Sequence, residues 1–176
     1  DLNIINDLVL SSKKLQLSEG ATERIVNCRA FLDEKMKTNK NPIYGINTGF
    51  GSLYNVKINN KNLTKLQENL MLSHACGTGD YVPREIVKLM LFLKIQSLSY
   101  GHSGVQLETV NRLIDFYNND ILPVVYTQGS LGASGDLAPL AHLALPLIGK
   151  GEVWYNNKVV SAAEICKKYD WQPIQL

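Results

Sequence analysis

Apolar residues recur every three or four positions near the start of the chain, and this spacing predicts a helix. Over residues 18–37 the apolar positions are Ala21, Ile25, Cys28 and Leu32. Side chains spaced in this way lie on one face of an α-helix, so the segment is predicted to be amphipathic. Ser18 is placed to cap its N-terminus. Pro42 ends it, because proline disfavours helical angles at the residue before it.

Three further helices are predicted in the middle of the chain. One runs from Asn62, as its N-cap, to about His74, where glycines follow. Another begins after Pro83, and its residues 86–98 include nine apolar residues out of thirteen. A helix that is apolar nearly all round is buried in a core or an interface, so we expect this one at the centre of the core. An amphipathic helix is predicted for residues 106–119.

The last part of the chain mixes irregular, helical and strand patterns. Residues 121–135 are apolar but rich in glycine and serine near their end, so we expect no regular element there. Residues 137–148 predict a strongly apolar helix. Residues 153–160 alternate around Asn156-Asn157, which is typical of a two-residue hairpin turn. With a short helix after Ser161, the pattern predicts one mainly α domain with a small β-hairpin.

Composition adds that the protein has a packed core, because 45% of its residues are apolar and 19% are charged. The 18 Lys and Arg residues against 16 Asp and Glu residues give a net charge of +2. A nucleic-acid-binding surface needs clustered excess positive charge. The near balance of charge therefore argues against a nucleic-acid partner.

The cysteines and histidines do not have the spacing of a metal site. Cys28, Cys76 and Cys166 are far apart and form no Cys-x-x-Cys pair. We therefore expect three small buried side chains in a reducing compartment rather than a disulfide framework or a zinc site. No two of the three histidines stand four residues apart, so no metal is predicted.

The chain is also not expected to contact a membrane. Its longest apolar stretch without a charge, residues 137–149, is too short to span a bilayer and contains two prolines. Residues 1–10 lack the basic and apolar regions of a secretory signal. We therefore expect a soluble, cytoplasmic protein. Because the chain starts with Asp1 rather than Met, we also expect that upstream residues are missing or were removed.

The most unusual segment is a glycine-rich loop that leads into a helix, residues 129–142, with the sequence GSLGASGDLAPLAH. Its Ala133, Ser134 and Gly135 are small, so the backbone can fold back until the Gly135 nitrogen approaches the Ala133 carbonyl carbon. A simpler interpretation is a tight loop with Ser134 or Asp136 as the helix cap. The interpretation of Ser134 as the nucleophile of a hydrolase is excluded, because the motif Gly-x-Ser-x-Gly needs a glycine where Asp136 stands. Asp136 is expected in the first helical turn, where its charge suits the helix dipole.

This run resembles a motif of the aromatic amino acid ammonia-lyase and aminomutase family. The resemblance implies that Ala133-Ser134-Gly135 cyclises into 4-methylideneimidazole-5-one, abbreviated MIO. The Gly135 nitrogen attacks the Ala133 carbonyl carbon, and two waters leave, one of them with the Ser134 hydroxyl. The product is an electrophile, which unmodified side chains do not supply. Asp136 is expected to assist this cyclisation or to hold the loop.

A second segment, residues 44–51, reads YGINTGFG and resembles the tyrosine loop of the same family. The resemblance implies that Tyr44 transfers a proton near the substrate, as the base or as part of its network. Gly45, Gly49 and Gly51 fit a loop that closes over a substrate and excludes water. Taken alone, Tyr44 would be read as a half-buried tyrosine in a turn.

A third segment, residues 72–79, resembles the part of the family that lines the pocket for the substrate side chain. Its Ser73-His74 pair is similar to the histidine branch of the family. An imidazole substrate needs a hydrogen-bond partner, which His74 can provide, whereas a phenyl ring needs only apolar walls. The other two histidines, His102 and His142, are expected to be structural. His142 is expected to bond to nearby backbone or to the loop.

The resemblance covers the whole chain but only part of the length of family members. It implies that residues 1–176 are the N-terminal, MIO-containing domain of a longer lyase, without the C-terminal bundle of long helices. The longer enzyme is expected to be a homotetramer that eliminates ammonia from L-histidine to give trans-urocanate. The 176 residues alone are expected to be inactive. The mature MIO group is not necessarily formed in them.

Two other interpretations stay open. A phenylalanine or tyrosine ammonia-lyase, or an aminomutase, would use the same MIO electrophile and differ in its pocket and product release. A non-catalytic helical module for assembly is an interpretation of another class. It is favoured by the very apolar residues 86–98, which would expose a surface intended for a missing partner.

Overall fold

The computed structural model describes residues 13–39, 41–59 and 62–175, together with Ile5, Asp7 and Ser11. Its α-helices in this part of the chain are α2 (Glu19–Thr38), α3 (Leu63–His74), α4 (Arg84–Ser99), α5 (Leu107–Asn118), α6 (Leu137–Ala144) and α7 (Ala162–Tyr169). Its strands are β1 (Thr78–Tyr81), β2 (Leu122–Pro123), β3 (Tyr126–Gln128), β4 (Glu152–Tyr155) and β5 (Lys158–Ser161). Short 3-10 helices are η1 (Gly51–Leu53), η3 (Gly132–Ser134) and η4 (Leu145–Ile148).

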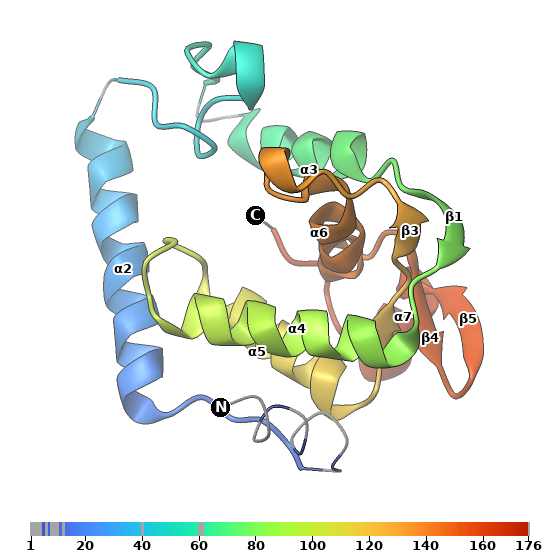
Figure 1. Ribbon diagram of the computed structural model, residues 1–176. Coiled ribbons are helices and arrows are strands. Elements are labelled where there is room, and N and C mark those ends of the chain that lie inside the picture. Colours follow the sequence, from blue (N-terminus) through green and yellow to red (C-terminus); the bar gives the residue numbers. More distant parts are fainter. Residues whose placement is uncertain are drawn as a thin grey trace.

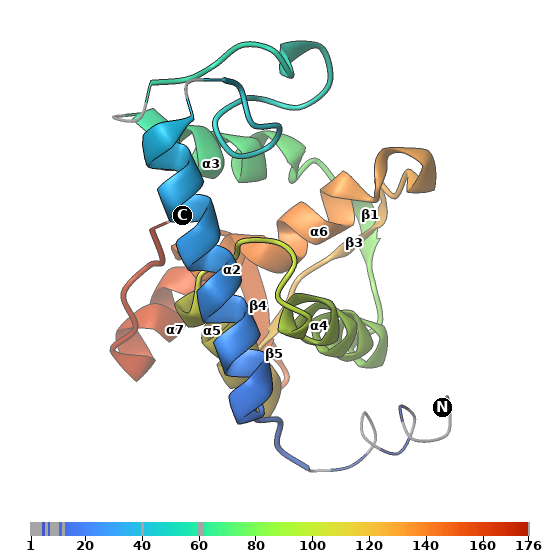
Figure 2. The same cartoon turned by 90° about the vertical axis from the view of Figure 1, so that its left-hand side faces the viewer.

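The helices enclose the middle of the molecule, and the strands gather at one edge (Figure 1). Helices α4 and α5 pack together, and α2 crosses one end of this pair. On the other side α3 packs on α6. Residues 41–59, between α2 and α3, form a loop beyond α3, and residues 129–136 project from the body just before α6 (Figure 2). The two loops that carry motifs therefore flank α3.

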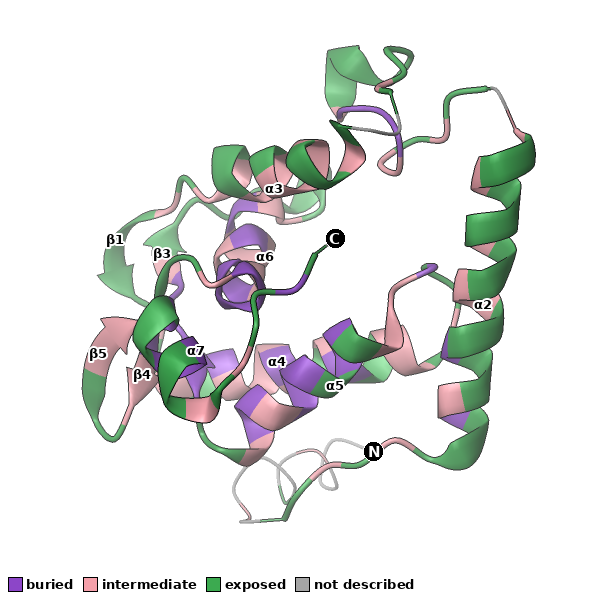
Figure 3. Ribbon diagram, turned by 180° about the vertical axis from the view of Figure 1, so that it is seen from behind, coloured by how far each residue is buried: buried purple, intermediate pink, exposed green. Residues whose placement is uncertain are grey.

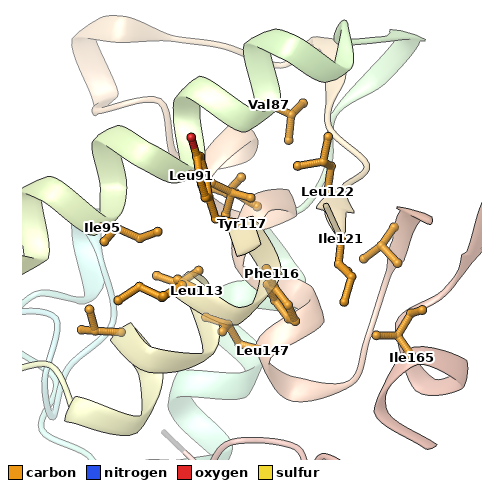
Figure 4. Packing of buried hydrophobic residues seen from close by; sticks show 14 of the residues in the cluster. Val87, Leu91, Ile95, Leu113, Phe116, Tyr117, Ile121, Leu122, Leu147 and Ile165 are labelled. Carbon is orange, nitrogen blue, oxygen red and sulfur yellow. The ribbon is translucent and has the colours of Figure 1, made fainter. Parts of the chain in front are cut away.

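The core lies where α4 and α5 face each other (Figure 4). Helix α4 contributes Val87, Leu91 and Ile95, which repeat every four residues and are at most 6% exposed. The fully buried side chains around them come from α5, from the segment after it, and from η4 and α7; they include Leu113, Phe116, Ile121, Leu122, Leu147 and Ile165. The apolar stripes of these amphipathic helices thus form one continuous core.

Helix α4 is buried on one face only, which corrects the expectation of a helix buried all round. Ile86 and Leu93 are each 47% exposed. Figure 3 shows that burial is more extensive on α5 than on α2, whose outer surface is open to solvent. An all-round apolar pattern gives no preferred face, so only packing against α5 decides which side of α4 is covered.

Among the described residues, the predicted hairpin is part of a three-stranded sheet, and there is a second, two-stranded sheet. Strands β4 and β5 form that hairpin, and Asn156 and Asn157 have the positive φ angles, 49° and 61°, that such a turn needs. Strand β2 pairs with β4, and β3 pairs with β1. The expectation of an irregular segment over residues 121–135 was therefore wrong at β2 and β3. These strands have two and three residues, and their partners lie far away in sequence.

The predicted helix starts are mostly confirmed by their caps. Ser18 Oγ accepts from the Ala21 N–H at 3.2 Å, and Ser161 Oγ accepts from the Glu164 N–H at 3.2 Å. Asn62 occupies the N-cap position of α3, but its side chain makes no capping hydrogen bond. No helix among the described residues combines the length and the apolar character that crossing a membrane requires.

The cysteines differ from expectation in their exposure. Cys166 is buried, Cys28 is half-buried and Cys76 is exposed, and all three are free thiols. Cys76 stands two residues after the end of α3, in the short segment that leads to β1. Among the described residues, no group of three or more His, Cys, Asp or Glu side chains is arranged to hold a metal ion.

Candidate active site

The Ala133-Ser134-Gly135 triplet lies in a tight turn that is organised by one carbonyl group. Leu131 O accepts from the Ser134 N–H and from the Ser134 hydroxyl, both at 2.9 Å, and from the Asp136 N–H at 3.3 Å. The Gly135 N–H donates to Gly132 O at 3.1 Å. Gly135 has a φ of 83°, which a glycine adopts at little cost. The positive φ at Gly135 is therefore what favours a glycine in this turn.

Asp136 supports this turn rather than the helix that follows. It stands at the N-cap position of α6 in a left-handed conformation, with φ of 55°, and makes no capping bond. Its carboxylate accepts from the Ser130 hydroxyl at 2.5 Å. Asp136 is therefore at the expected cap position, although its side chain does not bond to the helix, and the expectation that it lies within the first turn of α6 is wrong. A non-glycine residue in this conformation carries strain on the order of 1 kcal/mol, stored next to the triplet.

The triplet is exposed to solvent in this chain. Ala133, Ser134 and Gly135 are all exposed, and a Cβ built on Gly135 or Gly132 would meet no atom within 4 Å. The residue types and the turn fit the cyclisation to MIO, because Gly135 folds the chain back at a position that only glycine occupies easily. No described neighbour presses on the turn to force the ring to close.

The tyrosine loop is held in shape by its own buried polar side chains. Asn47 and Thr48 are 1% and 0% exposed. Asn47 Oδ1 accepts from the Ile43 N–H at 2.7 Å, and Thr48 Oγ1 accepts from the Gly45 N–H at 3.2 Å. Buried polar groups of this kind fix a loop because leaving one unpaired costs about 1–3 kcal/mol. Tyr44 itself is 62% exposed, rather than half-buried as the turn interpretation expects.

The glycines of this loop are favoured at their positions for different geometric reasons. Gly45 and Gly51 have positive φ angles of 69° and 57°. A Cβ on Gly49 would lie 2.9 Å from the Cβ of Leu53, closer than real side chains approach. The glycines therefore shape this turn, and the predicted closure over a substrate stays a prediction.

Helix α3 joins the tyrosine loop to His74. Gln67 Nε2 donates to Gly45 O at 3.1 Å and to Ile46 O at 3.0 Å. The Phe50 ring lies between Tyr44 and His74, with centroid distances of 5.7 Å and 5.4 Å. Sequence reasoning missed Gln67. The feature of the sequence that indicates Gln67 is its position seven residues before His74, which places both side chains on one face of a helix.

The His74 ring is oriented by a hydrogen bond to the backbone of its own helix. Its Nδ1 lies 2.7 Å from Leu70 O, and because a carbonyl oxygen only accepts, Nδ1 carries the proton. In the tautomer with its proton on Nδ1, Nε2 is an acceptor for a ligand. Ser73 is exposed, and its hydroxyl donates to the same carbonyl at 3.1 Å.

The segment after His74 lies beside the base of the triplet loop. Strand β1 pairs with β3, which leads into that loop. His142, on α6, accepts at Nε2 from the Gly77 N–H at 3.0 Å, as expected of a histidine bonded to nearby backbone. Burial lowers the pKa of His142. Among the described residues, no hydrogen bond or ring contact joins Tyr44 or His74 directly to the triplet.

A groove of about 620 Å³ borders the triplet loop on the side of α4. Its lining is mostly apolar, and Lys94 and Asp136 are its charged members. Gly135 also lines it, whereas Tyr44, Ser73 and His74 do not. The triplet loop therefore stands between this groove and the α3 side that carries the other motif residues.

Sequence comparisons agree with the three motifs. The model of the aromatic amino acid lyase family matches residues 1–176. A histidine ammonia-lyase of Deinococcus radiodurans is 48% identical over 178 residues, covering 100% of this chain and 34% of the relative. One from Legionella pneumophila is 51% identical over 160 residues, covering 91% of this chain and 32% of the relative. The chain thus spans about a third of the length of these relatives.

Solved structures share the fold over the whole chain. The phenylalanine aminomutase of Pantoea agglomerans has a TM-score of 0.92 at 30% identity, covering 100% of this chain and 34% of that one. The histidine ammonia-lyase of Trypanosoma cruzi has a TM-score of 0.86 at 33% identity, covering 99% of this chain and 34% of that one. The predicted fold class, a mainly α domain of the ammonia-lyase type, is confirmed. The chain belongs to the aromatic amino acid lyase family.

Proposed function

We propose that residues 1–176 are the N-terminal domain of a histidine ammonia-lyase, which eliminates ammonia from L-histidine to give trans-urocanate. The observation that carries the proposal is His74, whose Nε2 is left as an acceptor by the bond from Nδ1 to Leu70 O. An acceptor at this position suits the N–H of an imidazole and gives a phenyl ring nothing to pair with. The relatives named histidine ammonia-lyase, at 48% and 51% identity, support it.

The prosthetic group in this proposal is MIO, formed from Ala133-Ser134-Gly135. It supplies an electrophile for the amine of the substrate, which no unmodified side chain can do. The turn at Gly135 and the small residues before it support this assignment. Because the triplet is exposed here, we propose that ring closure needs the packing supplied by the rest of a full-length protein.

The motif residues then have distinct roles. His74 Nε2 accepts from the imidazole N–H of the substrate, with Ser73 beside it. Tyr44 takes part in removing the β-proton, and its loop is held on α3 by Gln67. Gly45, Gly49 and Gly51 shape that loop. Asp136, bonded to Ser130, supports the turn that contains the triplet.

The homotetramer is proposed for the full-length enzyme from the resemblance to the family, and exposed apolar side chains are compatible with it. Phe31 on α2 is 68% exposed, and Leu131 and Tyr44 beside the motifs are each 62% exposed. An assembly interface that also completes the site accounts for both the exposure and the position of these residues.

The test is the reaction of the full-length protein with L-histidine, L-phenylalanine and L-tyrosine. We expect ammonia and urocanate from L-histidine, measured by the ultraviolet absorbance of urocanate, and much slower reaction with the other two amino acids. Release of ammonia from tyrosine or phenylalanine but not from histidine would contradict the proposed specificity. A β-amino acid product would show an aminomutase instead.

A further inference from the structure

The segment after His74 and the base of the triplet loop are in close backbone contact. A Cβ built on Gly129 would lie 3.0 Å from the Cα of Gly77, and Gly129 has a φ of 138°, which favours glycine. Gly77 stands three residues after His74, and Gly129 stands four residues before Ala133. The distance between the two motifs is therefore set at this junction, where β1 and β3 also pair.

His142 makes a side-chain hydrogen bond across this junction. Its Nε2 accepts from the Gly77 N–H at 3.0 Å, and its ring meets the Tyr126 ring edge-on with centroids 5.0 Å apart. A backbone N–H can only donate, so Nε2 must be the unprotonated nitrogen of a neutral imidazole. The half-buried position, which lowers the pKa of His142, favours that neutral form.

The junction leaves little room for a side chain at Gly77. A Cβ on Gly77 would lie 3.1 Å from His142 Nε2 and 3.3 Å from Gln128 O. The ring thus meets the backbone of the segment after His74 directly. Since His142 stands on α6, seven residues after Gly135, one short helix carries both the end of the triplet loop and the bond that holds the other motif.

We propose that His142 is a positioning residue, which fixes the His74 segment relative to the Ala133-Ser134-Gly135 loop. The inference rests on the proposed function, in which His74 binds the imidazole end of the substrate and the triplet provides the group that reacts at its amine end. Both ends of one small molecule must then be placed together. A displacement of about 1 Å between two such groups lowers the rate by about 100-fold.

The test compares two substitutions in the full-length protein. His142→Phe keeps a ring against Tyr126 but has no acceptor, whereas the carboxamide oxygen of His142→Gln can still accept from the Gly77 N–H. We expect His142→Phe to lower kcat for L-histidine by about 10- to 100-fold while KM changes less than about threefold. We expect His142→Gln to keep kcat within about threefold of the unsubstituted protein.

A second measurement reads the hydrogen bond without using activity. Amide hydrogen exchange at Gly77 should be faster in His142→Phe than in the unsubstituted protein and close to normal in His142→Gln. If the unsubstituted protein does not release ammonia from L-histidine, the proposed function fails, and the exchange rates still report whether His142 holds this segment. Unchanged exchange or unchanged kcat in His142→Phe overturns the positioning role, as does a glutamine variant that is as impaired as the phenylalanine variant.

Discussion

The Nδ1 atom of His74 donates to the Leu70 carbonyl, and this one bond decides what the ring offers to a ligand. In the tautomer that has its proton on Nδ1, an imidazole offers an acceptor and no donor at Nε2. Such a group pairs with an N–H and not with a carboxylate. At the scale of single residues, this bond supports the proposal that His74 binds the side chain of the substrate.

Substituting His74 tests this assignment. His74→Leu in the full-length protein should lower kcat/KM for L-histidine by about 10- to 100-fold, because one buried N–H of the substrate loses its partner at about 1–3 kcal/mol. Steady-state kinetics with L-histidine measures this loss. The matched control is His102→Leu, since His102 is exposed in a turn and touches none of the motif residues. Equal losses in the two variants would contradict the role of His74.

At the scale of elements, α4 shows how packing selects one face of a helix. Leu91 is 0% exposed against α5, whereas Leu93, two residues further along, is 47% exposed. Two leucines of one helix therefore have different energetic roles, although sequence pattern treats them alike.

The free energy of unfolding should show this difference. Leu91→Ala should destabilise the chain by about 2–5 kcal/mol, because it leaves a cavity in the core. Leu93→Ala should change stability by less than about 1 kcal/mol, because its side chain is already half in solvent. Urea denaturation followed by circular dichroism measures both values. Similar losses in the two variants would mean that the face of α4 seen here is not the buried one.

Helix α6 gives a prediction about pH through His142. Burial lowers the pKa of His142 below its ordinary value of 6.5, so the folded chain binds this proton less readily than the unfolded chain. Stability should therefore fall as the pH is lowered through about 6.5 and toward 5, since the unfolded state takes up the proton first. Denaturation midpoints between pH 7.5 and 5 measure this effect. The slope should be smaller in His142→Gln, and an unchanged slope would contradict it.

At the scale of the whole molecule, the triplet and the apolar side chains around it are open to solvent. Leu131, whose carbonyl organises the triplet turn, is itself 62% exposed. The chain spans about a third of the length of its relatives. The candidate site described here therefore consists of three motif segments that one fold holds together. The tyrosine loop is bonded to α3, and His74 is the last residue of α3. The triplet loop is joined to them through β1, β3 and α6.

Intact mass should separate the chain from a full-length protein. We expect the 176-residue chain to have the mass of its unmodified sequence, because no described neighbour compresses the triplet, and a full-length protein to be lighter by two waters. Ser134→Ala in the full-length protein should not lose them, since the hydroxyl to be eliminated is gone. Loss of two waters by the chain alone would show that its own turn is sufficient for ring closure.

Much of the secondary structure was predictable from the sequence, because the interactions that begin and end these elements are local. Helix caps at Ser18 and Ser161 and the turn at Asn156-Asn157 act within a few residues, so they can be read along the chain. The strands β1 and β3 could not be read in this way. They are short, and each is stabilised by a partner some 50 residues away, which only the folded chain brings near.

The sequence by itself determined where the three motifs lie, since Tyr44, His74 and Ala133-Ser134-Gly135 stand in contiguous segments that resemble those of the family, and it predicted their roles in the proposed chemistry. Tertiary structure alone decided how they are held. Gln67 fixes the tyrosine loop and His142 meets Gly77 across 65 residues of sequence. It also decided that Tyr44 and the triplet face solvent. Motifs are local in sequence, whereas their partners and their exposure depend on packing between distant segments.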